Sequence, residues 1–387
     1  MPYVEGRTVH DADSHIVETP DWLDPFLPRD VRQRMPRLGL SAVRPGEHML
    51  IDKARSDHRD PAYRALDEEK ILLRKNWSAT GSFLKEDRPR ALDLLGFASQ
   101  LVFNTFLSKY LNSLEHSDDI DLAYDVARGH NRAMIDFCSN DKRLLATCYV
   151  PLADFDGAAR AAAEAIEMGA RALLVPSDCP RDHSPSHVGL FPVWAQAAEA
   201  GIPILFHVGG GGELLDPHYF DNGMPPIPDF HGGDENFRSV DYMAIPGPPA
   251  QTLATLIFDR VLDRHPSLMF GVIEQGASWV PGWMRMMDSA VAAFSKMEER
   301  LRSLSALPSQ IVRRQVRVTP YPSEDVGWII AQAGEEVCLF SSDYPHVEGG
   351  RNPIRRFEGT MKGLAPAAIE RFYRSNFEEL MGTALAR

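Results

Sequence analysis

The chain has 387 residues, of which 44% are hydrophobic and 25% charged, a balance typical of a globular protein with a sizeable core. The formal net charge of −13 argues against nucleic acid and against an anionic membrane surface as partners, because both require clustered lysine and arginine. No apolar run approaches the roughly 20 residues that span a bilayer, and the first residues lack an apolar secretory core. With four scattered cysteines, which fit reduced thiols, we expect a cytoplasmic protein.

The opening stretch, residues 7–18, has a β-prone start that runs into the pair Asp13 and His15. Alternate side chains of an extended segment share a face, so these two can point at one common object. A carboxylate beside an imidazole at a strand end suits a divalent metal ion. Such pairs also arise by chance, so the hypothesis depends on further ligands elsewhere in the chain.

Residues 29–90 are irregular in pattern and rich in charge, proline and arginine. Trp77 and Phe83 give this region something to bury, which favours an inserted, cap-like segment over disorder.

From residue 99 onward, short apolar strands alternate with amphipathic helices. We predict strands at 99–106, 143–151, 171–176, 202–208, 267–274, 315–320 and 336–343, and helices at 120–138, 156–168, 190–200, 249–264, 277–304 and 324–333, followed by two final helices. With the opening strand this makes eight, and such alternation means a parallel sheet, either open or closed into a barrel. No Gly-x-Gly-x-x-Gly follows the first strand, so a dinucleotide fold has no support. A single (β/α)8 barrel over residues 1–387 fits the repeats, with the insertion and a long loop after the fifth strand accounting for the excess length.

In such a barrel the chemistry lies at the carboxyl ends of the strands. His207 follows a buried apolar strand and precedes four glycines, and Asp343 ends the last predicted strand. A lone histidine there would more often be structural, and Asp343 could be a helix cap. Together with Asp13 and His15, however, they converge from strands one, five and eight. We therefore predict one metal ion held by these four residues, with a coordination position left open.

Other residues near the strand ends are candidates for substrate contact. Trp22, Trp279 and Tyr344 could line an apolar site, although an aromatic residue at such a position is more often a packing residue. Arg351 could hold a substrate carboxylate, or form a surface ion pair. His346 could transfer a proton next to Asp343.

The sequence resembles the amidohydrolase superfamily, specifically the amidohydrolase-2 group that includes aromatic-acid decarboxylases and meta-cleavage-product hydrolases. The resemblance is carried by residues 11–18, 205–209, 263–268, 274–281 and 340–346. It implies a metal-dependent (β/α)8 barrel in which Asp13, His15, His207 and Asp343 are the metal ligands. It also implies a small-molecule substrate and a homodimer or larger homo-oligomer. Zinc is the first expectation for the metal, with manganese or iron as alternatives.

The sequence departs from this family at the end of strand six, where many members carry a catalytic histidine. Here the stretch reads Gly-Val-Ile-Glu274-Gln-Gly-Ala. Glu274 could take an acid–base or substrate-orienting role, cap the next helix, or pair with Arg285. The main hypothesis is hydrolysis by a metal-activated water, with Asp343 as the proton acceptor. The alternatives are nonoxidative decarboxylation of an aromatic acid and a barrel that only binds a ligand or a partner.

Overall fold

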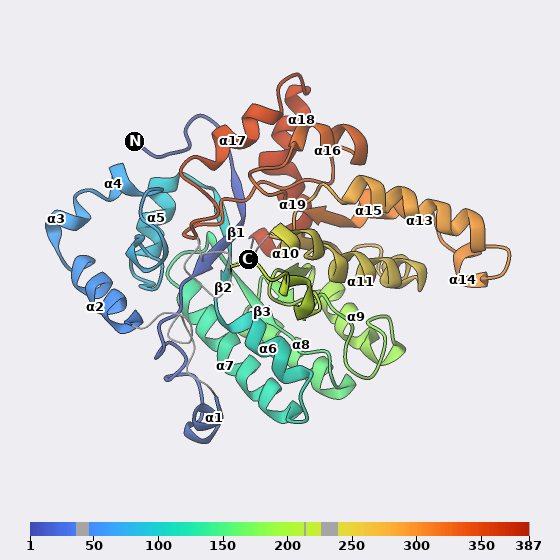
Figure 1. Ribbon diagram of the computed structural model, residues 1–387, viewed down its shortest axis with the longest axis horizontal. Helices are drawn as coiled ribbons and strands as arrows, with labels where there is room; N and C mark the ends of the chain where they lie inside the picture. The colour runs from blue at the N-terminus through green and yellow to red at the C-terminus, as the bar shows by residue number, and fades with distance from the viewer. Residues whose placement is uncertain (36–45, 213, 226–238, 387) are drawn as a thin grey trace.

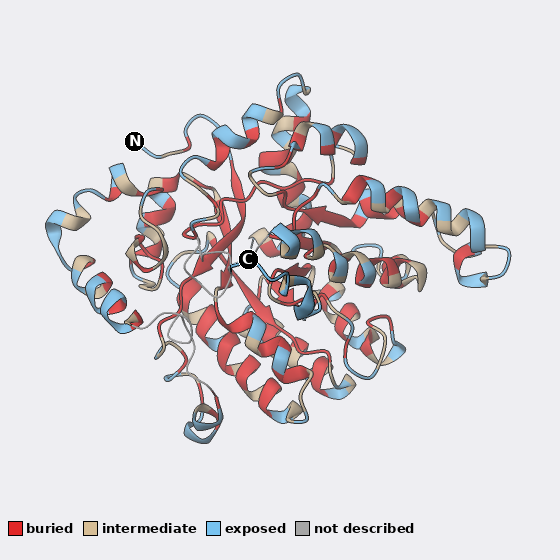
Figure 2. Ribbon diagram, viewed as in Figure 1, coloured by how far each residue is buried: buried red, intermediate tan, exposed pale blue. Residues whose placement is uncertain are grey.

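A sheet of seven parallel strands forms the centre of the computed structural model, which describes residues 1–35, 46–212, 214–225 and 239–386 (Figure 1). The strands are β1 (His10–Ile16), β2 (Ser99–Asn104), β3 (Leu144–Tyr149), β4 (Ala172–Leu174), β5 (Ile204–His207), β6 (Phe270–Ile273) and β7 (Val316–Val318). Each pairs with the next along the chain, which is the neighbour order that βα repeats produce. Every strand residue is buried, whereas the surrounding helices turn exposed faces outward (Figure 2).

Helices connect and surround the strands. The longer ones are α2 (Glu47–Asp57), α5 (Arg88–Leu95), α6 (Leu107–Glu115), α7 (Ile120–Cys138), α8 (Phe155–Met168), α9 (Phe191–Ala200), α11 (Gly247–Phe258), α13 (Val280–Phe294), α15 (Pro308–Gln315), α16 (Val326–Ala333) and α17 (Pro353–Thr360). The short ones are α1 (Arg29–Arg34), α3 (Pro61–Arg64), α4 (Asp67–Lys70), η2 (Asn76–Ser78), η3 (Val188–Leu190), η4 (Pro217–Phe220), α10 (Ser239–Ala244), α12 (Val261–Arg264), α14 (Glu299–Arg302), α18 (Pro366–Glu370), η5 (Arg371–Ser375), α19 (Asn376–Met381) and η6 (Gly382–Ala386). Within the described ranges, none of them has the length and apolar character needed to span a bilayer.

Local sequence signals explain where these helices begin and end. Asp154 caps α8 by accepting a hydrogen bond from the Gly157 N–H, and the helix ends at Gly169, whose φ of 103° is left-handed. Gly201 ends α9 in the same way, with φ 63°. Each of these turns leads directly into the next buried strand, so the βα repeat predicted from the sequence is confirmed here.

The predicted eighth strand, residues 336–343, is not a regular strand. Cys338 forms a parallel bridge with Val318 of β7, and Tyr344 forms one with Ser14 of β1. On the β1 side, the Ala12 N–H donates to the Phe340 carbonyl (3.1 Å) and the Asp343 N–H to the Asp13 carbonyl (3.0 Å). The segment therefore lies between the last and first strands, but the described residues form seven strands and not the predicted eight.

Two predicted helices are interrupted. The helix expected at 277–304 is divided into α13 and α14, and the one at 249–264 into α11 and α12. The second break falls at Arg260, whose φ of 65° is left-handed and cannot continue a right-handed helix. In the long loop after β5, η4 and α10 form, while residues 226–238 lie outside the described part of the chain.

The predicted insertion at 29–90 contains α1 to α4 and the start of α5, with residues 36–45 outside the described ranges. It is tied to the sheet by Arg88, which is fully buried. One guanidinium nitrogen of Arg88 donates to the His15 carbonyl (2.8 Å) and to the Gly81 carbonyl (3.3 Å). The insertion is thereby joined directly to the strand that carries Asp13 and His15; its role as a cap stays a prediction.

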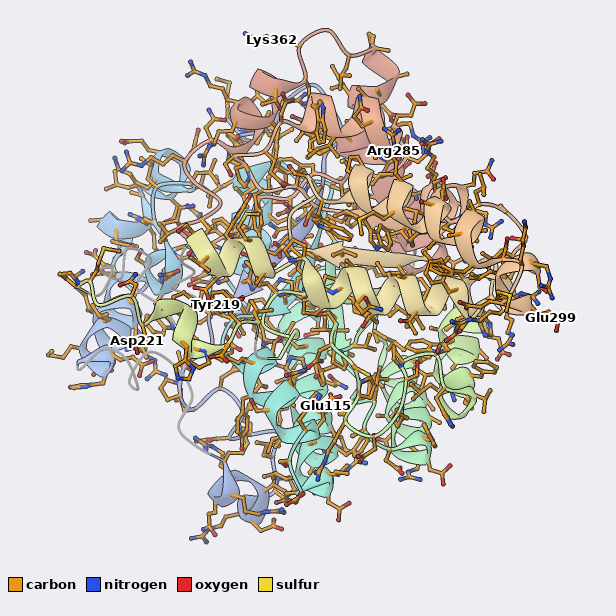
Figure 3. The ribbon with its side chains drawn as sticks, turned by 45° about the vertical axis from the view of Figure 1, so that its right-hand side comes forward. Glu115, Tyr219, Asp221, Arg285, Glu299 and Lys362 are labelled. Atoms are coloured by element: carbon orange, nitrogen blue, oxygen red, sulfur yellow. The ribbon has the colours of Figure 1, made fainter. Side chains whose placement is uncertain are left out.

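A buried carboxyl joins α6 to β3. Glu115, which is labelled in Figure 3, accepts a hydrogen bond from the Tyr149 hydroxyl (2.8 Å). Burial raises the pKa of Glu115 from 4.5 to about 8. The folded protein therefore keeps a proton that the unfolded chain loses between these pH values.

Stability should consequently fall as pH rises from about 4.5 to about 8, because the folded state binds more protons than the unfolded state over that range. Glu115→Gln should remove the pH dependence that Glu115 contributes to the free energy of unfolding. As pH rises, the variant should therefore gain stability relative to wild type by up to roughly 1.4 kcal/mol per pH unit. Urea unfolding at pH 5 and pH 8 measures the difference. Glu167→Gln, at an exposed position on α8, is the matched control. A pH-independent difference for Glu115→Gln would contradict the prediction.

Candidate functional site

Six buried side chains meet at the carboxyl end of the sheet, and we call them the ligand cluster. They are Asp13, His15, His207, Glu274, Asp343 and His346. The Nε2 atom of His15 lies 3.1 Å from an Asp13 oxygen and 3.6 Å from an Asp343 oxygen. The Nε2 atom of His207 lies 3.4 Å from Asp13 and 3.3 Å from Glu274. The structure thus brings together all six residues predicted for metal binding or catalysis.

Backbone carbonyls orient the two histidines that face Asp13. Nδ1 of His15 lies 3.1 Å from the Asn104 carbonyl, and Nδ1 of His207 lies 2.9 Å from the Val208 carbonyl. A carbonyl only accepts, so each Nδ1 carries the hydrogen and each Nε2 of a neutral ring presents its lone pair to the cluster. This outer hydrogen bond is the usual support of a metal-binding histidine.

The cluster contains two overlapping sets of possible metal ligands. Asp13, His15, His207 and Glu274 form one set, and His15, Glu274, Asp343 and His346 form the other. His15 and Glu274 belong to both. Neither set contains all four ligands predicted from the sequence, and Glu274 and His346 are additional possible ligands.

Burial and neighbouring charges set the ionisation states of Asp13 and His15. Burial, and then the nearby His346, lower the pKa of His15 to about 4, so the ring is neutral at neutral pH. Burial opposes ionisation of Asp13, but His15 and His207 outweigh it and hold its pKa below the usual range. A neutral imidazole next to an ionised carboxylate is the state that binds a cation.

Glu274 follows β6 directly and is held in an unusual backbone conformation, with φ 55°. Its N–H donates to the Thr319 hydroxyl (2.7 Å), and its carbonyl accepts from the Tyr321 hydroxyl (2.8 Å). A non-glycine residue pays for this conformation, and such outliers concentrate at functional sites. The two hydrogen bonds compensate for it and aim the side chain at His207.

The two structural roles considered for Glu274 are wrong. At the turn before α13, the backbone N–H groups of Ala277 and Ser278 donate to the carboxylate of Glu324, so Glu324 and not Glu274 caps this helix. Arg285 is exposed on α13 and is labelled in Figure 3, whereas Glu274 is buried and faces the histidines.

Asp343 is paired with His346, and its backbone is also left-handed, with φ 51°. Nδ1 of His346 lies 2.8 Å from an Asp343 oxygen, and its Nε2 lies 2.8 Å from the Thr105 hydroxyl. That hydroxyl donates its hydrogen to the Ile16 carbonyl, so it accepts from Nε2. The short contact to Asp343 then requires a second proton, on the ring or on the carboxyl group, or a cation in its place.

Asp11 supports the cluster and was missed by the sequence analysis. Its carboxylate accepts from the Ser342 N–H (2.7 Å) and hydroxyl (2.6 Å), and from the Gln100 amide (2.8 Å). It therefore fixes the residue before Asp343 against β1. Asp11 lies two residues before Asp13 on the same strand, so the period-two spacing could have identified it.

Lys75 of the insertion also reaches this region without having been predicted. Its Nζ donates to the Gly350 carbonyl (2.7 Å), and the neighbouring Asn76 N–H donates to the Pro345 carbonyl (3.0 Å). Burial lowers the pKa of Lys75, while the charge of Asp343 opposes that shift. The insertion thus packs on the turn that follows Asp343.

Two cavities adjoin the ligand cluster. One, of about 680 Å³, is lined by Asp13, Glu274 and Asp343, and we call it the carboxylate cavity. The other, of about 750 Å³, is lined by His207 and by the glycines that follow it. Val208 and Ile245 line both, so the cluster lies where the two cavities approach each other.

The residues predicted to contact substrate lie elsewhere. Tyr344 is buried, and its hydroxyl donates to the Thr80 carbonyl (2.7 Å), away from the cluster. Trp279 donates to the Gly276 carbonyl and packs against Trp283. Trp22 is half-buried, with its ring 6.1 Å from that of His130. Arg351 is exposed, and neither cavity includes it; Arg356, five residues later, lines the carboxylate cavity.

The donor set fits a divalent cation. It combines carboxylate oxygens with imidazole nitrogens, which suits zinc, manganese and iron. Oδ2 of Asp13 and both carboxylate oxygens of Asp343 are buried without a hydrogen bond among the described residues. Buried carboxylate oxygens of this kind are costly unless a cation compensates them.

Comparison with known proteins agrees with this geometry. The model of the amidohydrolase family matches residues 13–382. No match to a curated protein was found.

Similar solved structures share the fold over nearly the whole chain. The amidohydrolase map2389c from Mycobacterium avium subsp. paratuberculosis K-10 is 22% identical, covers 98% of this chain and 99% of its own, and has a TM-score of 0.74. A 5-carboxyvanillate decarboxylase from Novosphingobium aromaticivorans, complexed with manganese and 4-hydroxy-3-methoxy-5-nitrobenzoic acid, is 17% identical (97% and 96% covered, TM-score 0.64). A dihydroxybenzoic acid decarboxylase from Polaromonas sp. JS666, with bound manganese and the inhibitor 2-nitroresorcinol, is 15% identical (98% of both chains, TM-score 0.63). At these identities the likeness establishes the fold.

Metal binding should stabilise the protein, because the folded state alone assembles the cluster. After chelator treatment, Mn2+ at about 100 times its Kd should add roughly 2.7 kcal/mol to the free energy of unfolding. His207→Ala should lose most of this gain, and His218→Ala, at an exposed position, should keep it. Calorimetric titration with Mn2+ and Zn2+ gives the two affinities. Unchanged metal affinity in His207→Ala would contradict the assignment.

Proposed function

This chain belongs to the amidohydrolase family, and on that premise we propose that it is a metal-dependent enzyme that releases CO2 non-oxidatively from an aromatic acid. The observation that carries the proposal is the ligand cluster, with Glu274 buried beside the histidines at the edge of a cavity with apolar walls. Two of the structurally similar proteins are decarboxylases of hydroxylated aromatic acids, which supports this reaction over hydrolysis.

The metal would be held by Asp13, His15, His207 and Asp343, with Glu274 within reach of the same ion. A divalent cation bound there would supply the positive charge that holds the carboxylate and a neighbouring oxygen of the substrate. The neighbouring structures favour manganese as the first metal to test, ahead of the zinc expected from the sequence.

The residues of the chain then position the substrate and supply a proton. When the bond between the ring carbon and the carboxylate breaks, CO2 leaves and the electron pair stays on the ring carbon, which must take up a proton. The carboxyl group of Glu274, whose backbone is fixed by Thr319 and Tyr321, is the donor, and solvent returns the proton after CO2 has left. His346 holds Asp343 in place through their 2.8 Å contact.

Hydrolysis is the second candidate, and one observation favours it. Glu274 follows β6 at the position where many members of the family carry a histidine, and a buried carboxylate can accept a proton from water. In that reaction Glu274 or Asp343 would take the proton of the attacking water and pass it to the leaving group.

The remaining expectations belong to the same proposal. The substrate is a small molecule that enters one of the two cavities, and the protein assembles as a homodimer or larger homo-oligomer. The segment at 29–90 would act as a cap over the turn that Lys75 contacts.

Incubation of the manganese-loaded protein with 2-hydroxybenzoic acids in 18O-labelled water should release CO2 and yield a phenol without label from the solvent. Glu274→Gln should lower the rate by about 10²- to 10⁴-fold, as loss of a proton donor does, while it retains bound manganese. Glu335→Gln, exposed and remote, is the control. Label incorporated into the product of an ester, lactone or amide would instead establish hydrolysis, and full activity of Glu274→Gln would remove its assigned role.

A further inference from the structure

The carboxylate cavity combines acidic groups at the ligand cluster with apolar walls. Tyr242 and Met243 of α10 line it opposite Pro320 and Tyr321, which follow β7. The rings of Tyr242 and Tyr321 lie 5.1 Å apart at 37°. Such walls can enclose a flat aromatic ring, whose faces gain from contact with other rings.

Arg356 is the only cationic side chain that lines this cavity among the residues that the structure describes. It lies on α17, and one of its terminal nitrogens approaches Gly350 so closely that an added Cβ there would be 3.0 Å away. Because Gly350 has no side chain, the guanidinium can extend past the turn toward the cavity. No described residue forms an ion pair or hydrogen bond with this guanidinium.

Arg356 is a positive charge in a cavity whose other charged lining residues are acidic. Asp13, Glu274, Asp343 and Glu348 contribute four carboxylates to its lining, and a divalent cation at the ligand cluster would offset two of them. An anion entering the cavity is therefore attracted at two places, the metal and Arg356. A guanidinium pairs with a carboxylate through two parallel hydrogen bonds, which also orients the bound group.

We propose that Arg356 binds a second acidic group of the substrate, so that the enzyme acts on aromatic acids with two carboxylates, one held at the ligand cluster and one at Arg356. This inference rests on the proposed function and names its substrate class. It assigns to Arg356 the substrate contact that the sequence analysis expected of Arg351.

The test is calorimetric binding of two probes to the manganese-loaded protein, benzene-1,3-dicarboxylate and benzoate. Wild type should bind the dicarboxylate more tightly. Arg356→Met should weaken dicarboxylate binding by about 10- to 100-fold, as loss of a charged hydrogen-bonding pair does, and change benzoate binding less than twofold. Arg356→Lys should recover part of the loss, because it keeps the charge without the planar pair of donors.

Arg355→Met and Arg351→Met are matched controls, since both residues are exposed, close in sequence and absent from the cavity lining. Neither should change the preference for the dicarboxylate. Equal affinity of wild type for both probes, binding of neither, or an unchanged preference in Arg356→Met would overturn the inference. These binding results do not depend on turnover. Failure to release CO2 from any acid would remove the proposed function and leave a measured role for Arg356 intact.

Discussion

The mutual burial of three carboxylates beside three imidazoles is the constraint on which the rest of the site depends. Asp13, Glu274 and Asp343 are each less than 10% exposed, and ionised carboxylates at such depth repel one another. Neutral histidines cannot compensate this charge, and burial keeps His15 neutral. A divalent cation can, so the arrangement is stable as a binding site and costly as a purely structural one.

The fold meets this constraint with support placed behind each ligand. Asp11 fixes Ser342, Thr319 and Tyr321 fix the backbone of Glu274, and two carbonyls fix the imidazole rings. Glu274 and Asp343 both have left-handed backbones, at φ 55° and 51°. Both side chains belong to the ligand cluster, which indicates that the fold places them accurately at some cost in backbone strain.

The segments that line the cavities differ from those that carry the ligand cluster. Loops and helices after β2, β5 and β7, together with the segment at 341–343, line the cavities, while the sheet and its buried ends carry the ligands. The cationic residue in the carboxylate cavity comes from α17, the helix after the last ligand. Substrate preference can therefore change through loops and outer helices without disturbing the metal ligands, a general property of this fold class.

The sequence by itself determined the α/β class, the parallel order of the strands and the residues of the ligand cluster. Buried parallel strands are continuous apolar runs, and a polar residue at the end of such a run is conspicuous, as His207 and Asp343 are. The tertiary structure alone decided the rest. Residues 336–343 read as a strand because they are apolar, but only isolated bridges form there, on both sides. Trp22, Trp279 and Tyr344 are aromatic residues near strand ends, yet their side chains turn to other partners. The direction of Glu274 and the placement of Arg356 in place of Arg351 depend on contacts between segments far apart in the chain, which no local pattern encodes.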